Sequence, residues 1–132
     1  MGMVIPIREA VVSNGADGDH RGPTDIESFE GISGIVDATN GMFLTGVFLG
    51  DSIPFDPAPA RLDFTDGEAF ESLAPQIAQT FFVGDGAGKR FLVPEGASRL
   101  FLGFADAAGY RGDPGWYGNN AGYLDVTVQV NE

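Results

Sequence analysis

Hydrophobic and polar residues alternate along short segments of the chain, and glycine, proline, asparagine and aspartate separate these segments. The clearest alternation runs from Leu124 to Val130, where every second residue is apolar. A period of two residues predicts a β-strand with one buried face. On this basis, strands are predicted near residues 4–12, 32–36, 42–49, 61–64, 79–83, 90–93, 99–105 and 123–130.

The segments between these strands have the composition of turns and loops. Turns are predicted at three dipeptides, Asn14-Gly15, Asp66-Gly67 and Asp85-Gly86. The last of them is expected to open a hairpin into the strand at 90–93. Residues 53–60 contain several prolines and predict an irregular surface loop, while 68–77 predicts one helical turn at most. Short strands joined by such turns indicate a single all-β domain over residues 1–132, an antiparallel sandwich or barrel.

Composition narrows the class of protein further. A chain of 132 residues can bury a core of its own as one domain. The absence of cysteine excludes disulfides and zinc–thiolate sites. The chain has 7 basic and 19 acidic residues and a net charge of −12. Nucleic acid is therefore not expected as a partner, because binding to phosphates requires basic patches.

Membrane insertion is not expected either. The longest apolar stretch covers only residues 42–49, which is too short to cross a bilayer. Met1 and Gly2 are followed by no signal-peptide pattern, and we expect them to derive from cloning. Export with a signal already removed is compatible with this sequence.

Hard oxygen donors stand at two neighbouring strand ends near the C-terminus. Asp106 follows the apolar strand at 99–105, and Asn119 and Asn120 precede the strand at 123–130. Antiparallel pairing of these strands would bring the three side chains to one end of a sheet. Calcium prefers such a shell of carboxylate, amide and carbonyl oxygens. The same residues are also typical of a turn and a strand cap, so both interpretations stay open here.

Other chemistries have weaker support in the sequence. Residues 17–22 begin like an EF-hand loop, but Arg21 and Ser28 stand where that loop requires oxygen ligands, so an acidic surface loop is expected. Gly50-Asp51-Ser52-Ile53 is similar to the opening of GDSL-type esterases, yet the only histidine, His20, lies upstream of it, and a polar turn is expected. No pair of acids is singled out for glycoside hydrolysis. An enzyme is therefore not expected.

The C-terminal motif carries a family resemblance. LFLGFAD…PGWYGNNAGYLDVTV resembles the end of the PA-IL-like bacterial lectins, which are calcium-dependent and bind galactose. GMFLTGVFLGDSIP and FLVPEGASRLFLGFAD are similar to upstream parts of that family. Through ISGIV and QTFFVGDG, the chain also resembles exported bacterial proteins with C-terminal sorting tails that share this domain. The resemblance spans roughly residues 4–130 and implies an antiparallel β-sandwich, a jelly roll of the galactose-binding-domain kind.

The resemblance also implies a ligand set. Calcium would be held by three side chains and two backbone carbonyls, namely Asp106, Asn119, Asn120 and the carbonyls of Trp116 and Asn14. In the family, calcium also takes two vicinal sugar hydroxyls. The residues expected to contact the sugar or share its calcium are Asp106, Asn119, Trp116, His20, Thr24 and Asp25. Trp116 or Tyr117 would cover the apolar face of the sugar ring.

Three departures from the family pattern are present. The histidine with which the family contacts sugar is shifted or lost here, because Gly22 stands at its position and Asp25 stands where the family has glutamine. The stretch between Asp106 and Pro114 is longer than in the lectins, so Asp113 is an alternative or additional ligand. No counterpart of the family's first strand precedes Val4. That strand is then trimmed, supplied by another protomer, or absent from a smaller sandwich.

The sequence thus leads to one functional hypothesis and one alternative. The hypothesis is an exported, calcium-dependent carbohydrate-binding module that recognises a vicinal diol, with galactose first among the candidates. A single small site binds weakly, so an oligomer or a multidomain parent is favoured. The alternative is an extracellular structural or interaction domain that calcium stabilises and that binds no free sugar.

Overall fold

The computed structural model describes residues 7–9, 16–20, 22–105, 124–126, 128 and 130. This part of the chain is all-β and contains no helix, and hence none that could span a membrane. Its strands are β1 (Ile7–Glu9), β2 (Thr24–Ile26), β3 (Ile35–Asp37), β4 (Leu44–Leu49), β5 (Leu62–Asp63), β6 (Ser72–Leu73), β7 (Phe81–Phe82), β8 (Arg90–Phe91), β9 (Arg99–Phe104) and β10 (Leu124–Val126).

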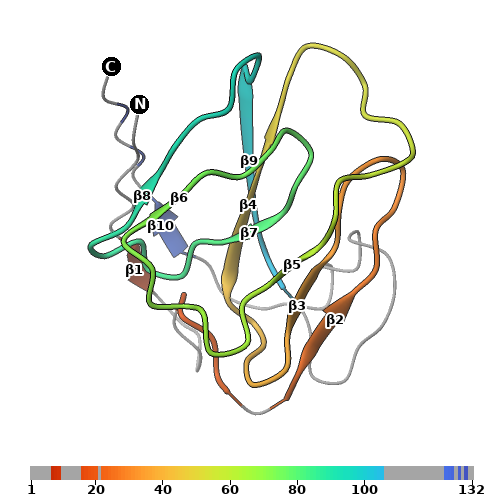
Figure 1. The fold of residues 1–132 in the computed structure, drawn as a ribbon. Helices are drawn as coiled ribbons and strands as arrows, with labels where there is room; N and C mark the ends of the chain where they lie inside the picture. The colour runs from red at the N-terminus through yellow and green to blue at the C-terminus, as the bar shows by residue number, and fades with distance from the viewer. Residues whose placement is uncertain are drawn as a thin grey trace.

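The strands form four small sheets. Their hydrogen-bonded orders are β1–β10, β2–β3–β5, β7–β4–β9 and β6–β8. The sheet built on β4 and β9 runs through the middle of the ribbon (Figure 1). These two strands pair antiparallel, from Leu44 opposite Phe104 to Leu49 opposite Arg99. On the other edge of β4, Gly46 lies opposite Phe81 of β7.

The remaining sheets contain two antiparallel and two parallel pairings. β2 runs antiparallel to β3, and β1 runs antiparallel to β10. β5 is parallel to β3, and β8 is parallel to β6. Parallel neighbours cannot be joined by a tight turn, so both pairings bring together segments that a longer connection separates.

The eight predicted strands agree with the structure in place, and two of the ten strands observed in the described residues were not predicted. Every segment predicted from alternation overlaps one observed strand, whereas β2 and β6 were not predicted. Residues 68–77, for which one helical turn at most was expected, contain no helix and include β6, which pairs with β8. The hairpin expected at Asp85-Gly86 is wrong. Gly86 N donates to the carbonyl of Val83 in a turn there, but β7 pairs with β4 and β8 pairs with β6.

Phenylalanine side chains join the sheets through one core. The ring of Phe81 in β7 stacks on Phe48 of β4 with centroids 5.3 Å apart, and it lies 5.2 Å from the ring of Phe91 in β8. Phe82 lies 4.9 Å from Phe43 and 5.9 Å from Phe64, which follows β5. Such pairs contribute about 0.5–1.5 kcal/mol each beyond the burial of their area. The aromatic cluster therefore links three of the four sheets.

Truncation of the central ring tests this account of the core. Phe81 is fully buried, so Phe81→Ala should lower the free energy of unfolding by about 3–5 kcal/mol, through lost burial and the cavity left behind. Phe55→Ala is the matched control, because the Phe55 side chain is exposed, and it should change that free energy by less than about 0.5 kcal/mol. Chemical denaturation of the two variants makes the comparison. Equal losses would contradict the proposed role of Phe81.

Candidate functional site

Two segments far apart in the sequence meet at the beginning of β4. Leu44 N donates to the carbonyl of Ala16 at 2.8 Å, and Met42 N donates to the carbonyl of Ala105 at 2.6 Å. Ala105 N in turn donates to the carbonyl of Phe43 at 2.9 Å. The end of β9 and the segment before β2 are thus held at the same end of β4.

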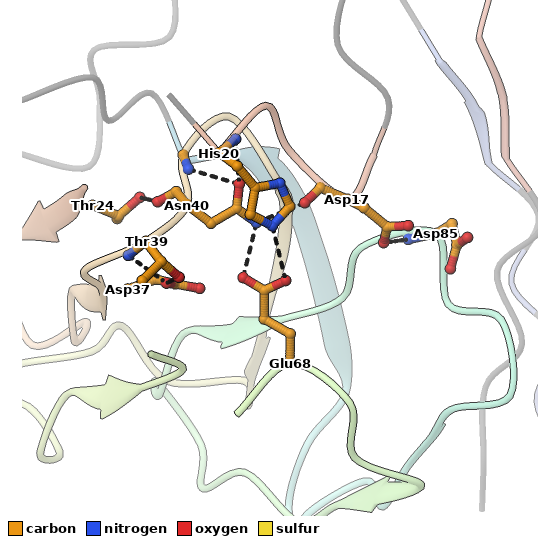
Figure 2. Close-up of polar contacts among 9 residues, drawn as sticks. Asp17, His20, Thr24, Asp37, Thr39, Asn40, Glu68 and Asp85 are labelled. Carbon is orange, nitrogen blue, oxygen red and sulfur yellow. Dashed lines mark hydrogen bonds and ion pairs between the residues drawn. The ribbon is translucent and has the colours of Figure 1, made fainter. Parts of the chain in front are cut away.

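Asn40 organises the polar groups at this end of the molecule. It is fully buried, and its side chain uses its whole hydrogen-bonding capacity. Oδ1 accepts from the backbone N–H groups of Gly41, at 2.9 Å, and His20, at 3.1 Å. Nδ2 donates to the carbonyl of Asp17 at 2.6 Å and to Oε2 of Glu68 at 2.9 Å (Figure 2). One amide group therefore ties residues 17–20 to the segment that precedes β6.

The backbone of residues 17–20 is shaped to fit closely around Asn40. Gly18 has a φ of +95°, and a Cβ atom there would collide with Asn40 Oδ1, so glycine is required at this position. Asp19 N donates to the carbonyl of Gly41 at 3.0 Å. The Asp17 carboxylate accepts from the backbone N–H of Asp85 at 2.9 Å. The loop is therefore anchored at several points by hydrogen bonds.

Carboxylates surround this amide group. Asp17, Asp37 and Glu68 come from three separate segments and lie around Asn40 (Figure 2). Burial first, and then the neighbouring Asp37 carboxyl, which favours the protonated form, raise the pKa of Glu68 to about 7. The negative potential of the cluster favours cations over anions. Even so, no group of three or more His, Cys, Asp or Glu side chains within the described residues is arranged to hold a metal ion.

The structure describes three of the residues that were expected to contact sugar. His20 has a side chain that is 57% exposed, with Nε2 at 3.8 Å from Glu68 Oε1. Thr24 is buried, and its hydroxyl donates to the carbonyl of Asn40 at 2.7 Å. Asp25 forms an ion pair with Arg61 at 2.6 Å. Asn40 thus brings His20 and Thr24 together, while Asp25 is engaged elsewhere. Their roles in sugar binding stay predictions.

The expected calcium ligands lie outside the described residues. These are Asp106, Trp116, Asn119, Asn120 and Asn14, together with the alternative ligand Asp113 and the ring-covering residue Tyr117. Two sequence neighbours of this set are described, since Asp106 follows Ala105 and Asn14 lies two residues before Ala16. Both alanines are hydrogen-bonded at the start of β4, as described above.

Two motifs considered in the sequence lie in polar loops. Asp17 of the EF-hand-like segment forms an isolated bridge with Phe43, and its loop borders the carboxylate cluster. The GDSL-like segment follows the end of β4, and Asp51 Oδ1 accepts from Ser98 Oγ at 2.6 Å. The hydrogen bond to Ser98 gives Asp51 a structural role in this turn.

Sequence reasoning did not identify Asn40, Asp37 or Glu68. Asp37 and Asn40 stand in the stretch Asp-Ala-Thr-Asn-Gly, whose composition is typical of a solvated turn. Nothing local distinguishes a buried Asn or Asp from an exposed one. Both are fully buried in the structure. The single available signal was the position of this polar stretch directly before the most apolar strand.

Comparison with protein-family models, curated proteins and solved structures found no match to this chain.

Removal of the Asn40 amide should release the loop at residues 17–20. Asn40→Ala leaves buried backbone groups without partners, and it should lower the free energy of unfolding by about 3 kcal/mol or more. Gln76→Ala, which truncates an exposed amide side chain, should have an effect within about 0.5 kcal/mol. Denaturation gives the free energies, and amide hydrogen exchange at His20 and Gly41 reports the loop. Unchanged exchange in Asn40→Ala would show that Asn40 does not anchor this loop.

Proposed function

We propose that this protein is a calcium-dependent carbohydrate-binding module that recognises a vicinal diol of a sugar such as galactose and does not cleave it. In this proposal, the small sheets belong to a jelly-roll sandwich like that of the PA-IL-like lectins, which the sequence resembles. The protein acts outside the cell, and the absence of cysteine is compatible with that setting. Oligomers or a multidomain parent raise the affinity of a weak single site.

The observation that carries this proposal is the meeting of Ala16 and Ala105 at the start of β4. Asp106 is one residue from Ala105, and Asn14 is two residues from Ala16. Consecutive Cα atoms are about 3.8 Å apart, so both proposed ligands are within chain reach of this end of β4. The sequence resemblance assigns these same two residues to one calcium ion.

Local charge and exposure support the same location. The carboxylate of Asp17 and the carboxyl pair of Asp37 and Glu68 lie around Asn40, and the net negative potential of these groups would attract a divalent cation. His20 is the proposed sugar contact with the most accessible side chain. The Thr24 hydroxyl and the Asp25 carboxylate already have protein partners, so we assign the hydroxyl-sensing role to His20 first.

The alternative is an extracellular structural or interaction domain in which calcium only locks the loops. The dense hydrogen bonding around Asn40 favours this alternative, because it gives residues 17–20 a fixed structural framework without a bound sugar. Both functions require calcium, and they differ only in whether sugar hydroxyls complete its coordination shell.

The calcium site is tested by thermal unfolding. Calcium binding to the folded state alone should stabilise the wild-type protein by about 2.7 kcal/mol at a concentration 100-fold above Kd, and EDTA should reverse this effect. Asp106→Ala should abolish the calcium-dependent rise in Tm, because it removes the principal charged ligand. Glu95→Ala removes an exposed carboxylate elsewhere and should leave the rise intact. A full calcium response in Asp106→Ala would exclude Asp106, and Asp113→Ala would then be tested as the alternative.

Sugar binding is tested by calorimetry with galactose, mannose and fucose, each with calcium and with EDTA. The proposal expects binding of a sugar with a vicinal diol, galactose first, and its complete loss in EDTA. His20→Ala should weaken sugar binding while the calcium-dependent rise in Tm is kept. Binding that survives EDTA would refute the mechanism. Failure to bind any of the three sugars, with the calcium response intact, would favour the structural alternative.

A further inference from the structure

Asp37 has a buried carboxylate oxygen without a hydrogen-bond partner. The residue is fully buried at the end of β3. Its Oδ1 accepts from the N–H and the hydroxyl of Thr39, both at 3.1 Å. Its Oδ2 is buried and receives no hydrogen bond. Burying a charged oxygen without a hydrogen-bond donor costs free energy of folding. A proton or another positive group beside Asp37 Oδ2 would remove this cost.

The group that Asp37 faces is also a carboxyl. Figure 2 shows the Asp37 carboxylate directed toward the carboxyl group of Glu68. Glu68 Oε2 accepts from Asn40 Nδ2, and the Glu68 side chain is 22% exposed. Two carboxylates cannot donate to each other. If Glu68 carries a proton, its O–H can donate to Asp37 Oδ2 while the other Glu68 oxygen keeps the bond from Asn40.

We propose that Asp37 and Glu68 share one proton, and that loss of this proton to solvent loosens the anchorage of residues 17–20 on Asn40. In the protonated state, the Glu68 hydroxyl donates to Asp37 Oδ2, which is the one buried side-chain atom between Asp37 and Asn40 that otherwise has no partner. After the proton leaves, two negative carboxylates face each other across a partly buried space. Repulsion then drives Glu68 toward solvent and away from the Asn40 amide, which also holds Asp17.

The titratable groups around Glu68 differ in sign. Asp37 and Asp17 are negative and oppose the ionisation of Glu68. His20 lies 3.8 Å away and would favour the ionised form when it is itself protonated. Lys89, from the segment before β8, lies with Nζ over the rings of Phe70 and Phe82. The Asp17 carboxylate is itself engaged with the backbone of Asp85. Because burial and the negative charges of Asp37 and Asp17 oppose its ionisation, Glu68 keeps its proton to a higher pH than an isolated glutamate does.

The direction of the pH effect follows from proton binding. Burial and Asp37 raise the pKa of Glu68 from 4.5 to about 7, so the folded state holds a proton that the unfolded state has already released. The stabilisation from this group is complete below pH 4.5 and is lost as the pH rises through about 7. A functional consequence is a loop at residues 17–20 that is firmer in mildly acidic than in alkaline surroundings.

The decisive variant is Glu68→Gln, compared with the wild type between pH 5 and pH 8 in EDTA and without sugar. An amide at this position can donate to Asp37 Oδ2 and accept from Asn40 Nδ2, so it imitates the protonated state at every pH. The wild-type Tm should fall relative to that of Glu68→Gln by at least about 5 °C over this range. Glu71→Gln removes an exposed carboxylate three residues away, and its Tm should stay parallel to that of the wild type. His20→Gln removes the imidazole, so a pH dependence of Tm that remains in this variant does not come from His20.

Two further measurements keep the inference testable if Glu68→Gln folds poorly. The carboxyl carbon resonance of Glu68 should titrate near pH 7 in the wild type and at clearly lower pH in Asp37→Asn, whose amide would stabilise the ionised form. Protection of the His20 and Gly41 amides should be lower in the wild type than in Glu68→Gln at pH 8, and equal at pH 5. Parallel Tm curves, or titration of Glu68 near its ordinary value, would overturn the proposal. Because calcium and sugar are absent, these outcomes are independent of the proposed carbohydrate binding.

Discussion

The burial of phenylalanine rings between the sheets is the interaction on which the rest of the structure depends. Among the described strands, only β4 and β9 are longer than three residues. A hydrogen bond contributes only about 1 kcal/mol net, whereas ordering one residue costs about 1–2 kcal/mol, so pairing alone cannot hold such short strands together. Phe81 and Phe82 touch rings from β4, from β8 and from the residue after β5. These contacts turn several marginal sheets into one cooperative body.

The polar end of the molecule depends on that core through β4. Phe43 is fully buried, and the backbone on either side of it binds Ala16 and Ala105. Asn40, three residues earlier, is buried as well, and its side chain forms a network of hydrogen bonds at the edge of the core. A buried amide is tolerated because all four of its hydrogen-bonding positions are used. The carboxylates beside it have no comparable set of partners, and burial with the nearby Asp37 raises the pKa of Glu68 to about 7.

Many of the strands were predictable because they lie in segments whose pattern of apolar and polar residues is visible in the local sequence. The apolar runs at 42–49 and 99–105 located β4 and β9 without any knowledge of their partners. β2 was missed because Thr24–Ile26 follows Pro23 in a polar stretch, and its pairing with β3 is what makes it a strand. β6 was missed because two residues carry no period, and its partner β8 lies far along the chain. The hairpin at Asp85-Gly86 was expected from the local turn residues alone. It does not form, because β7 pairs with β4 instead of β8.

The sequence by itself determined an all-β chain of short strands, a strong negative charge and a set of oxygen donors, because periodicity, turn chemistry and composition are properties of neighbouring residues. Only the tertiary structure decided which distant segments meet. Asp17, Asp37, Asn40 and Glu68 stand in loops that look alike in sequence, and their hydrogen bonds and raised pKa arise from contacts across 23 and 28 positions. Burial decides whether an Asn or Asp is a solvated turn residue or a structural centre. Burial is set by packing of the phenylalanine core, which no local pattern encodes.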